Sequence, residues 1–272
     1  MNVLKWVGSK RESINTIIDT INTSGTQHRR VFDCMAGSAC FALTYNHPNT
    51  IVNDINSDVI NLFHVLADKE LYQEFVTHLN KLKNEKEFYY ETRALFNSLP
   101  KIADVNTQAS SLHAALFYYL VSFGFRGLSR YNKKGEINTA YGNVKSNVQR
   151  YYIDHRAGLE TAGEFFANQV VVQGDVFDLL DSYEIGAGDL VYLDPPYLDT
   201  VQPYVKTFNK QDVFALFKRA KQLAEAGADV VVSYADDPMT YLKNAGFEVK
   251  ELVTSNILAN NLRKESLTYY LH

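Results

Sequence analysis

The chain has 272 residues, 46% of them hydrophobic, and a net charge of −4, which predicts one large domain or a domain with an insertion. No apolar run reaches the 18 residues of a membrane span, and the N-terminus lacks the apolar centre of a signal peptide. We therefore expect a cytoplasmic protein with no membrane partner. The two cysteines, Cys34 and Cys40, have the spacing of neither a disulfide framework nor a zinc site, so no metal is expected.

The first third of the chain predicts alternating strands and helices. Isoleucines recur at helical spacing over residues 14–21, and Arg30-Val-Phe-Asp33 reads as a short strand. A loop of small residues, 34–39, then leads into a helix, an arrangement that lets the backbone approach a nucleotide-like ligand closely. The loop has a single glycine, which disfavours NAD but not a cofactor without a pyrophosphate. An ordinary turn between strand and helix gives the same pattern.

The next predicted strand, residues 50–54, ends in an acid that lies 21 residues after Asp33. A carboxylate at this point of a nucleotide-binding fold can accept hydrogen bonds from both hydroxyls of a ribose. The alternative interpretation is that Asp54 only caps the helix predicted over residues 57–66.

From residue 70 to about 163 the strand–helix alternation lapses. Residues 71–82 and 88–99 read as amphipathic helices, and apolar residues recur at helical spacing between Leu112 and Phe123. The pattern predicts a mostly helical insertion.

A basic hairpin is predicted inside this insertion, because alternating residues flank the turn Asn132-Lys-Lys-Gly135. Residues 126–156 contain seven basic and two acidic side chains, a local charge of +5 in an acidic chain. Such a hairpin can enter a DNA groove, read guanine with arginine, and fill a gap in the base stack with leucine or tyrosine. A solvated loop is the alternative interpretation.

The alternation resumes with a strand over residues 169–173, followed by Asp175 and Phe177. At the carboxyl end of a strand, these two side chains could hold an adenine amino group and cover its ring; a helix cap and a core aromatic are the alternative. A helix over 211–226, a strand over 229–233 and a closing antiparallel pair over 247–254 and 266–271 complete the chain. A polar connection is expected over 256–264.

The run Asp189-Leu-Val-Tyr-Leu-Asp194-Pro195-Pro-Tyr197 predicts a buried strand that stops at a carboxylate and a stiff loop. The carboxylate and the carbonyl of Pro195 are two acceptors for the two N–H groups of an exocyclic amine, and Tyr197 can stack on its ring. Two such acceptors would favour a tetrahedral nitrogen with a free lone pair, as methyl transfer requires. A turn with Asp194 as a helix cap is the alternative.

Read together, these segments resemble the Dam-type DNA adenine-N6 methyltransferases of the alpha group, over most of the chain. Lys5-Trp6-Val-Gly-Ser-Lys10 is similar to the family's N-terminal Lys-Trp-Ala-Gly-Gly-Lys, and residues 33–38 to its cofactor loop. Asp54 matches the ribose acid, Asp194-Pro-Pro-Tyr197 the catalytic motif, and Gly127-Leu-Ser-Arg-Tyr-Asn132 with Gly135-Glu136 the recognition hairpin. The order of these motifs is that of the alpha group.

The resemblance implies an α/β fold with a Rossmann-like, seven-stranded mixed sheet that binds S-adenosylmethionine. Residues 1–69 and 164–272 would form the catalytic domain, and 70–163 an inserted, mostly helical target-recognition domain with a β-hairpin. The implied cofactor contacts are Trp6, Lys10, Asp33, Met35, Ala36, Gly37, Ser38, Asp54, Asp175, Val176, Phe177 and Asp194. The implied contacts with double-stranded DNA are Arg126, Leu128, Arg130, Tyr131, Asn132, Lys133, Lys134, Asn138, Ala140 and Tyr141. Asp194, Pro195 and Tyr197 would act on an adenine flipped out of the duplex.

Some residues depart from the family pattern. Met35 stands where the family usually has phenylalanine, and Ala39 where glycine is common, which predicts a looser cofactor pocket. Leu128 and Arg130 are retained, which favours a short G-containing site, but Ala140 stands where enzymes that read GATC carry proline. The recognition sequence, a restriction endonuclease partner, and the choice between monomer and weak dimer stay open.

Two alternative functions stay open from the sequence. A methyltransferase acting on cytosine N4 or a glutamine amide also needs acceptors for a conjugated amine, although Ser or Asn usually stands first in those motifs. A non-catalytic DNA-binding module on the same fold is the second. No Pro-Cys nucleophile exists in this chain, which disfavours methylation of cytosine C5.

Overall fold

The computed structural model describes residues 3–6, 8–102, 104–127, 129–198, 208–234, 239–256 and 261–272. Its strands are β1 (Arg30–Asp33), β2 (Thr50–Asp54), β3 (Val170–Gln173), β4 (Asp189–Leu193), β5 (Asp229–Tyr234), β6 (Glu248–Asn256) and β7 (Asn261–Tyr270). Its helices are α1 (Ile14–Asn22), α2 (Cys40–Tyr45), α3 (Ser57–Ala67), α4 (Lys69–Leu79), α5 (Lys86–Ser98), α6 (Ser111–Phe123), the 3₁₀ turn η1 (Phe125–Gly127), α7 (Val148–Phe166), α8 (Val176–Ser182), α9 (Lys210–Glu225) and α10 (Met239–Asn244).

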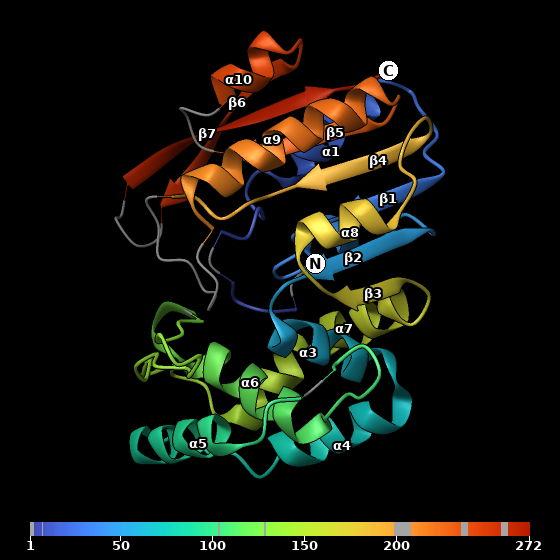
Figure 1. The fold of residues 1–272 in the computed structure, drawn as a ribbon. Helices are drawn as coiled ribbons and strands as arrows, with labels where there is room; N and C mark the ends of the chain where they lie inside the picture. Colours follow the sequence, from blue (N-terminus) through green and yellow to red (C-terminus); the bar gives the residue numbers. More distant parts are fainter. Residues whose placement is uncertain are drawn as a thin grey trace.

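The strands form one seven-stranded mixed sheet in the order β3-β2-β1-β4-β5-β7-β6 (Figure 1). The five strands from β3 to β5 are parallel, and β7 is antiparallel to both of its neighbours. Every residue of β4 and β5 is buried, because helices cover both faces of the parallel part. The predicted fold class is therefore confirmed.

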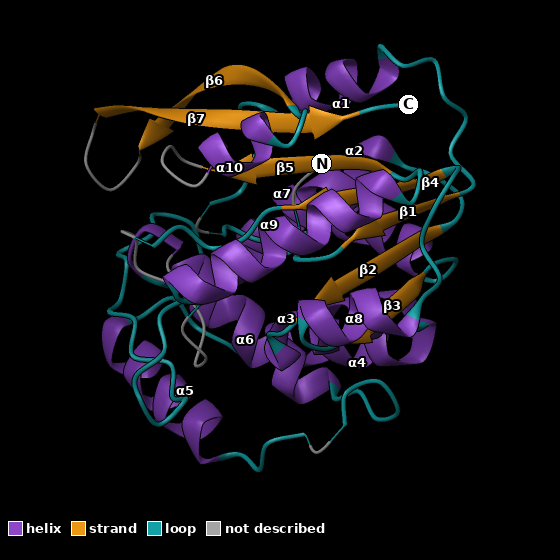
Figure 2. Cartoon of the chain, turned by 45° about the horizontal axis from the view of Figure 1, so that its top comes forward, coloured by secondary structure: helices purple, strands orange, loops and turns teal. Residues whose placement is uncertain are grey.

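Two sets of helices enclose the sheet. Helices α8 and α9 pack on the face that carries Phe32 and Val191, while α1 and α2 pack on the opposite face with Val31 and Leu190. This division follows from the two-residue period of a strand, which sends successive side chains to opposite faces. The views in Figures 1 and 2 show α8 and α9 on one side of the strands.

The strand order reverses between β1 and β4. From β1 the chain continues to β2 on one side, and from β4 it continues to β5 on the other side. Phe32 pairs with Val191 and Asp33 with Tyr192. The loops that follow β1 and β4 therefore leave the sheet side by side. In open α/β sheets this reversal is where ligands bind.

The insertion is mostly helical, as predicted. Helices α4, α6 and α7 pack with α3 around one apolar core that also includes Val52 of β2, and Figure 1 shows this layer beyond the β3 edge. α7 runs through residue 163, where we placed a domain boundary, and α3 shares its core with the insertion. The division at residues 69/70 and 163/164 stays a prediction.

The loop between α6 and α7 returns on itself, with a turn in which Gly135 N–H donates to the Asn132 carbonyl at 2.9 Å. Only two isolated antiparallel bridges are formed among its described residues, Gly124 with Tyr141 and Tyr131 with Ile137. The polar connection predicted over 256–264 is wrong in part, because β7 begins at Asn261 and pairs with β6 up to Asn256. The backbone ladder extends through polar residues there, since pairing does not require apolar side chains.

No helix in the described part of the chain is long and apolar enough to span a membrane.

The amino end of β4 is secured by a buried carboxylate. Asp189 is fully buried and accepts hydrogen bonds from Arg29 at 3.0 Å, from Arg30 at 2.7 Å and from the Gly186 N–H at 3.1 Å. Burial alone would raise the pKa of Asp189, but the hydrogen bonds from Arg30 and Arg29 bring this pKa below its ordinary value.

We expect Asp189→Asn to lower the free energy of unfolding by about 2–3 kcal/mol, because two guanidinium groups lose their carboxylate. Urea unfolding measures this. Asp181→Asn is the matched control, since Asp181 pairs with Arg219 at 2.9 Å but is 73% exposed; we expect it to change stability by less than about 0.5 kcal/mol. Equal effects of the two substitutions would contradict the assignment.

Candidate active site

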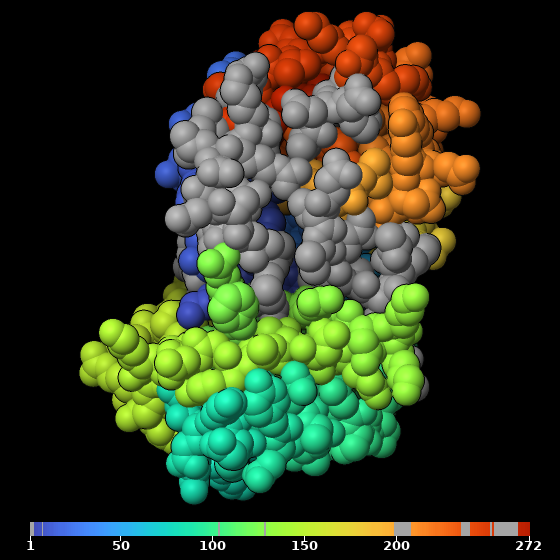
Figure 3. All heavy atoms as spheres, turned by 90° about the vertical axis from the view of Figure 1, so that its left-hand side faces the viewer, coloured from blue at the N-terminus to red at the C-terminus, as the bar shows by residue number. Residues whose placement is uncertain are grey.

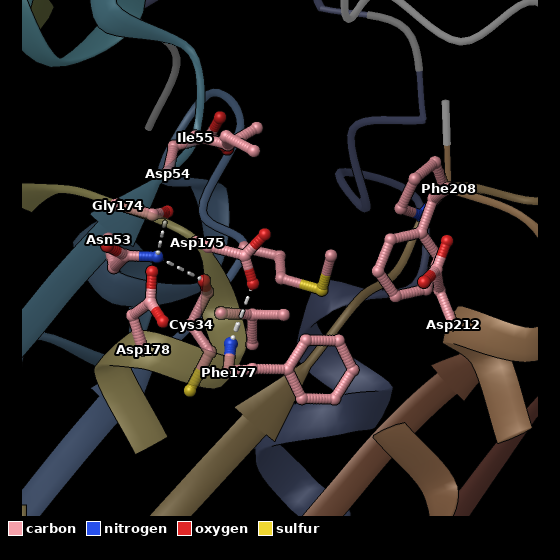
Figure 4. Close-up of a pocket in the computed structure, with 13 residues that line it drawn as sticks. Cys34, Asn53, Asp54, Ile55, Gly174, Asp175, Phe177, Asp178, Phe208 and Asp212 are labelled. Atoms are coloured by element: carbon pink, nitrogen blue, oxygen red, sulfur yellow. Dashed lines mark hydrogen bonds between the residues drawn. The ribbon is translucent and has the colours of Figure 1, made fainter. Parts of the chain in front are cut away.

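A cavity of about 290 Å³ lies over the carboxyl ends of the parallel strands (Figure 4). Five of the residues predicted as cofactor contacts line it: Met35, Asp54, Asp175, Val176 and Phe177. Its remaining lining residues were not predicted: Cys34, Asn53, Ile55, Gly174, Asp178, Pro196, Phe208 and Asp212. Segments from four different strand ends thus converge on one hollow.

The loop after β1 is shaped by two residues with positive φ. Gly37 has φ +52°, and a Cβ atom there would lie 2.9 Å from the ring of Trp6, so Trp6 packs directly over the glycine. Trp6 itself is buried and contacts Phe117 edge to face. Ala39 also has positive φ, +54°, which costs a residue with a side chain more than glycine.

Asp54 ends β2 and is buried under this loop. Its two carboxylate oxygens accept hydrogen bonds from the Gly37 N–H at 2.8 Å and the Asn56 N–H at 2.8 Å. The cap of α3 is Asn56, so Asp54 is not the cap that we considered as an alternative. Burial raises the pKa of Asp54 to about 6, although the backbone N–H groups oppose the shift.

Asp33 ends β1 and is as deeply buried as Asp54. One oxygen accepts a hydrogen bond from the Ala42 N–H at 3.2 Å, and the other, Oδ1, has no hydrogen-bond partner among the residues that the structure describes. Burial, together with the charges of Asp194 and Asp54, raises the pKa of Asp33 to about 8, although the hydrogen bond from the Ala42 N–H opposes the shift. A buried carboxyl group with a raised pKa and an unused oxygen favours a ligand that brings positive charge or N–H donors.

Asn53 is a site residue that the sequence reading missed. Its amide nitrogen donates to the carbonyls of Cys34 at 2.9 Å and Gly174 at 3.2 Å, which ties together the loops after β1 and β3. Its buried Oδ1 accepts no hydrogen bond from the described part of the chain. A polar residue inside an apolar strand, directly before Asp54, was the available signal.

The segment after β3 supplies the far wall of the cavity. Asp175 caps α8 by accepting the Phe177 N–H at 3.0 Å, so the helix-cap interpretation is right, and the same residue also lines the cavity. In Figure 4 the ring of Phe177 and that of Phe208 lie on opposite sides of the hollow. Aromatic rings that line a cavity suit a flat heterocycle.

Asp194 and Tyr197 lie beside the cavity, at the end of β4, and Pro196 between them reaches its wall. The Asp194 carboxylate accepts a hydrogen bond from the Lys10 ammonium at 2.8 Å, and the Tyr197 hydroxyl accepts one at 2.9 Å. The ring of Tyr197 is buried and meets Tyr234 edge to face, with centroids 5.1 Å apart. The structure thus brings the catalytic candidates close to Asp33 and Lys10.

The remaining predicted cofactor residues have structural contacts. Ala36 donates its N–H to the Asn53 carbonyl at 2.9 Å, and the Ser38 hydroxyl donates to that of Ser9 at 3.3 Å. Neither lines the cavity. In the described part of the chain, no group of three His, Cys, Asp or Glu side chains is placed to hold a metal ion.

The predicted DNA contacts fall into two groups on the loop between α6 and α7. The exposed members are Arg126, Arg130, Lys133, Lys134, Asn138 and Ala140. The others are half-buried: the Tyr131 hydroxyl donates to Asp58 at 2.6 Å, that of Tyr141 to Asn84 at 2.8 Å, and Asn132 to Glu136 at 2.7 Å. Leu128 lies outside the described residues. In Figure 3 this loop forms part of the lime-green band.

The sequence of this chain is similar to that of a known protein family and of several characterised proteins. Residues 6–261 match the family model described as "D12 class N6 adenine-specific DNA methyltransferase". The chain is 30% identical to the retron Ec67 DNA adenine methylase of Escherichia coli, over 86% of this chain and 77% of that protein. It is 28% identical to the type II methyltransferase M.MjaIII of Methanocaldococcus jannaschii, over 94% and 91% of the two chains, and 25% identical to the DNA adenine methylase of Vibrio cholerae, over 95% and 90%.

Asp33 makes the stability of the ligand-free chain depend on pH. Its pKa is about 8 in the folded chain and about 3.9 when unfolded, so the folded chain binds an extra proton between these values and loses stability as the pH rises. Asparagine has no proton to lose. The free energy of unfolding of Asp33→Asn should therefore exceed that of the wild type by an amount that grows from pH 5 to 8, by up to about 1.4 kcal/mol per pH unit.

Urea unfolding at several pH values, without cofactor, measures this difference. Asp19→Asn, on the exposed face of α1, is the control, and we expect its difference from the wild type to stay constant. A constant difference for Asp33→Asn as well would show that Asp33 is ionised in the folded chain.

Proposed function

Because the chain belongs to the D12 class of N6 adenine-specific DNA methyltransferases, we propose that the cavity and the Asp194–Tyr197 segment together form its site for S-adenosylmethionine and a target adenine. The enzyme is an adenine-specific DNA methyltransferase, and membership of a methyltransferase family implies the use of S-adenosylmethionine. The observation that carries the proposal is the position of Asp194 and Tyr197 beside the cavity, where the strand order reverses.

The chemistry of the cavity fits S-adenosylmethionine. Asn53 on the cavity wall and Asp33 behind the loop after β1 each have a buried oxygen with no hydrogen-bond partner among the described residues, and the cofactor offers N–H donors and positive charge. Asp54 would accept the ribose hydroxyls, Asp175 the adenine amino group, and the rings of Phe177 and Phe208 would enclose the adenine. Trp6 holds the loop around Gly37 in place rather than lining the cavity. When bound, the cofactor supplies the methyl group.

The residues after β4 would act on the target amine. The Asp194 carboxylate and the Pro195 carbonyl would accept the two N–H groups of adenine N6, which aligns its lone pair with the methyl group. Asp194 is also an acceptor for the proton that N6 loses. Tyr197 would stack on the base, which must leave the duplex to reach these groups.

The exposed basic side chains of the loop between α6 and α7 would contact the DNA. We propose that Arg126 and Arg130 reach base edges in the major groove, while Lys133 and Lys134 contact phosphates. A short site that contains guanine, such as GATC, is the proposed target. Tyr131 and Tyr141 would support the loop from inside, since their hydroxyls are bonded within the protein.

The biological setting is part of the proposal. One relative carries the name of a type II methyltransferase, so a cognate restriction endonuclease stays among the proposed partners. We infer a monomer or weak dimer, working in the cytoplasm of a bacterium or of a phage-infected host, where DNA and S-adenosylmethionine are both present. Cytosine N4 is the alternative target, which nucleoside analysis separates from adenine N6.

The first test uses labelled S-adenosylmethionine and duplex DNA of mixed sequence. We expect label in N6-methyladenine, and at least about a 100-fold lower rate for Asp194→Ala, because N6 loses a fixed acceptor. Asp181→Ala, on the exposed surface, should act like the wild type. Label in N4-methylcytosine, or full activity of Asp194→Ala, would overturn the proposal.

The second test separates base reading from phosphate contact. Arg130→Ala should weaken binding to the cognate site by about 1–3 kcal/mol and bring it closer to binding of unrelated DNA. Lys134→Ala should weaken binding to both DNAs alike and reduce the slope of log Kd against log salt by about 1. Titrations of labelled duplexes at several salt concentrations measure both. The assignment fails if Arg130→Ala weakens both DNAs equally.

A further inference from the structure

Lys10 joins two residues of the catalytic segment. Its ammonium lies 2.8 Å from the Asp194 carboxylate and 2.9 Å from the Tyr197 hydroxyl, and it donates to the Gly8 carbonyl at 3.2 Å. A lysine has three N–H donors, which suits it to bridging several acceptors. The side chain of Lys10 is only 5% exposed. A flexible side chain is thereby held in one position between residues 187 positions apart.

The hydroxyl contact also orients the Tyr197 ring. The Lys10 ammonium lies 4.9 Å from the centroid of that ring, and Tyr234 packs edge to face against it at 5.1 Å. Tyr234 in turn meets Phe217 of α9 edge to face. The ring is therefore held at its hydroxyl by Lys10 and at its side by an aromatic chain that leads into the core.

Two buried groups lie close enough to Asp194 for its charge to act on them. The pKa of Asp33, at the end of β1, is raised by burial and also by the charges of Asp194 and of Asp54, at the end of β2. Burial, together with the charges of Asp194 and Asp33, also raises the pKa of the Tyr192 hydroxyl in β4. A carboxylate among like charges favours its protonated form, and an adjacent ammonium favours the ionised form.

We propose that Lys10 is a positioning residue for the target amine, holding the Asp194 carboxylate ionised and the Tyr197 ring oriented before the base arrives. The inference rests on the proposed function of this site. The family resemblance implied a contact between Lys10 and the cofactor, whereas the observed contacts are with the residues that would hold the adenine. Lys10 therefore acts mainly on the rate of methyl transfer, and little on cofactor affinity.

Lys10→Met tests this, since methionine keeps the length of the side chain and removes the charge. In single-turnover reactions with saturating cofactor and DNA, we expect the rate to fall at least about 30-fold. Calorimetry with S-adenosylhomocysteine should give a Kd within about 5-fold of the wild type. When the rate of methyl transfer is plotted against pH, the fall at low pH (the acid limb) should move to higher pH, because Asp194 loses the cation that keeps it ionised.

Two further variants separate charge from geometry. Lys10→Arg keeps the charge, so its acid limb should stay at the wild-type pH although its rate is lower. Tyr197→Phe keeps the ring and removes the hydroxyl, so its rate should fall less than that of Lys10→Met. Lys218→Met, exposed on α9, is the matched control and should act like the wild type.

A binding measurement gives a readout that does not depend on methyl transfer. With 2-aminopurine in place of the target adenine, its fluorescence in the DNA complex reports how the flipped base is held. We expect a different fluorescence for Lys10→Met than for the wild type, at equal DNA affinity, because the Tyr197 ring is less ordered.

The outcomes separate the two proposals. If excess cofactor restores the rate of Lys10→Met, Lys10 is a cofactor ligand and the inference is wrong. If the acid limb stays in place for Lys10→Met, Lys10 has only a structural role, and the inference is wrong again. A wild-type enzyme that places no label in N6-methyladenine would instead overturn the proposed function.

Discussion

The site depends on the burial of carboxylates that end neighbouring strands. Asp33, Asp54 and Asp194 close β1, β2 and β4, and little water reaches the first two. Burial and mutual repulsion raise the pKa of Asp33 to about 8 and burial raises that of Asp54 to about 6. The chain offsets this with backbone N–H groups and with one buried ammonium, that of Lys10. Such a site is best stabilised by a positively charged ligand, which links the electrostatics of the fold to its proposed cofactor.

The topology of the sheet creates this concentration of charge. Parallel strands have their carboxyl ends at the same edge of the sheet. The loops after β1 and β4 start side by side there and then lead to opposite sides, which leaves a hollow between them. The insertion after α3 uses the same edge, since Tyr131 reaches back to Asp58 at the start of α3. The basic loop and the cavity are thus connected through α3, so one scaffold positions both the arginines proposed to contact DNA and the carboxylate proposed to act on the adenine.

Much of this arrangement could be predicted from local sequence. Asp33, Asp54 and Asp194 each follow an apolar run, and a strand end is a local property. The contact of Lys10 with Tyr197 could not be predicted, because it joins residues 187 positions apart and depends on how the N-terminal segment folds over the sheet. Tyr131 and Tyr141 looked like DNA contacts because aromatic residues suit both a groove and a core; only the structure shows that their hydroxyls point inward. The start of β7 was missed because its polar residues are paired through the backbone.

The most direct test of the account is a structure of the enzyme with S-adenosylhomocysteine and a duplex that carries its target adenine. We predict that N6 of the extruded base lies within about 3.2 Å of both the Asp194 carboxylate and the Pro195 carbonyl, with its ring against Tyr197 and Lys10 still on Asp194. A base that stays stacked in the duplex, or an N6 atom turned away from Asp194, would contradict it.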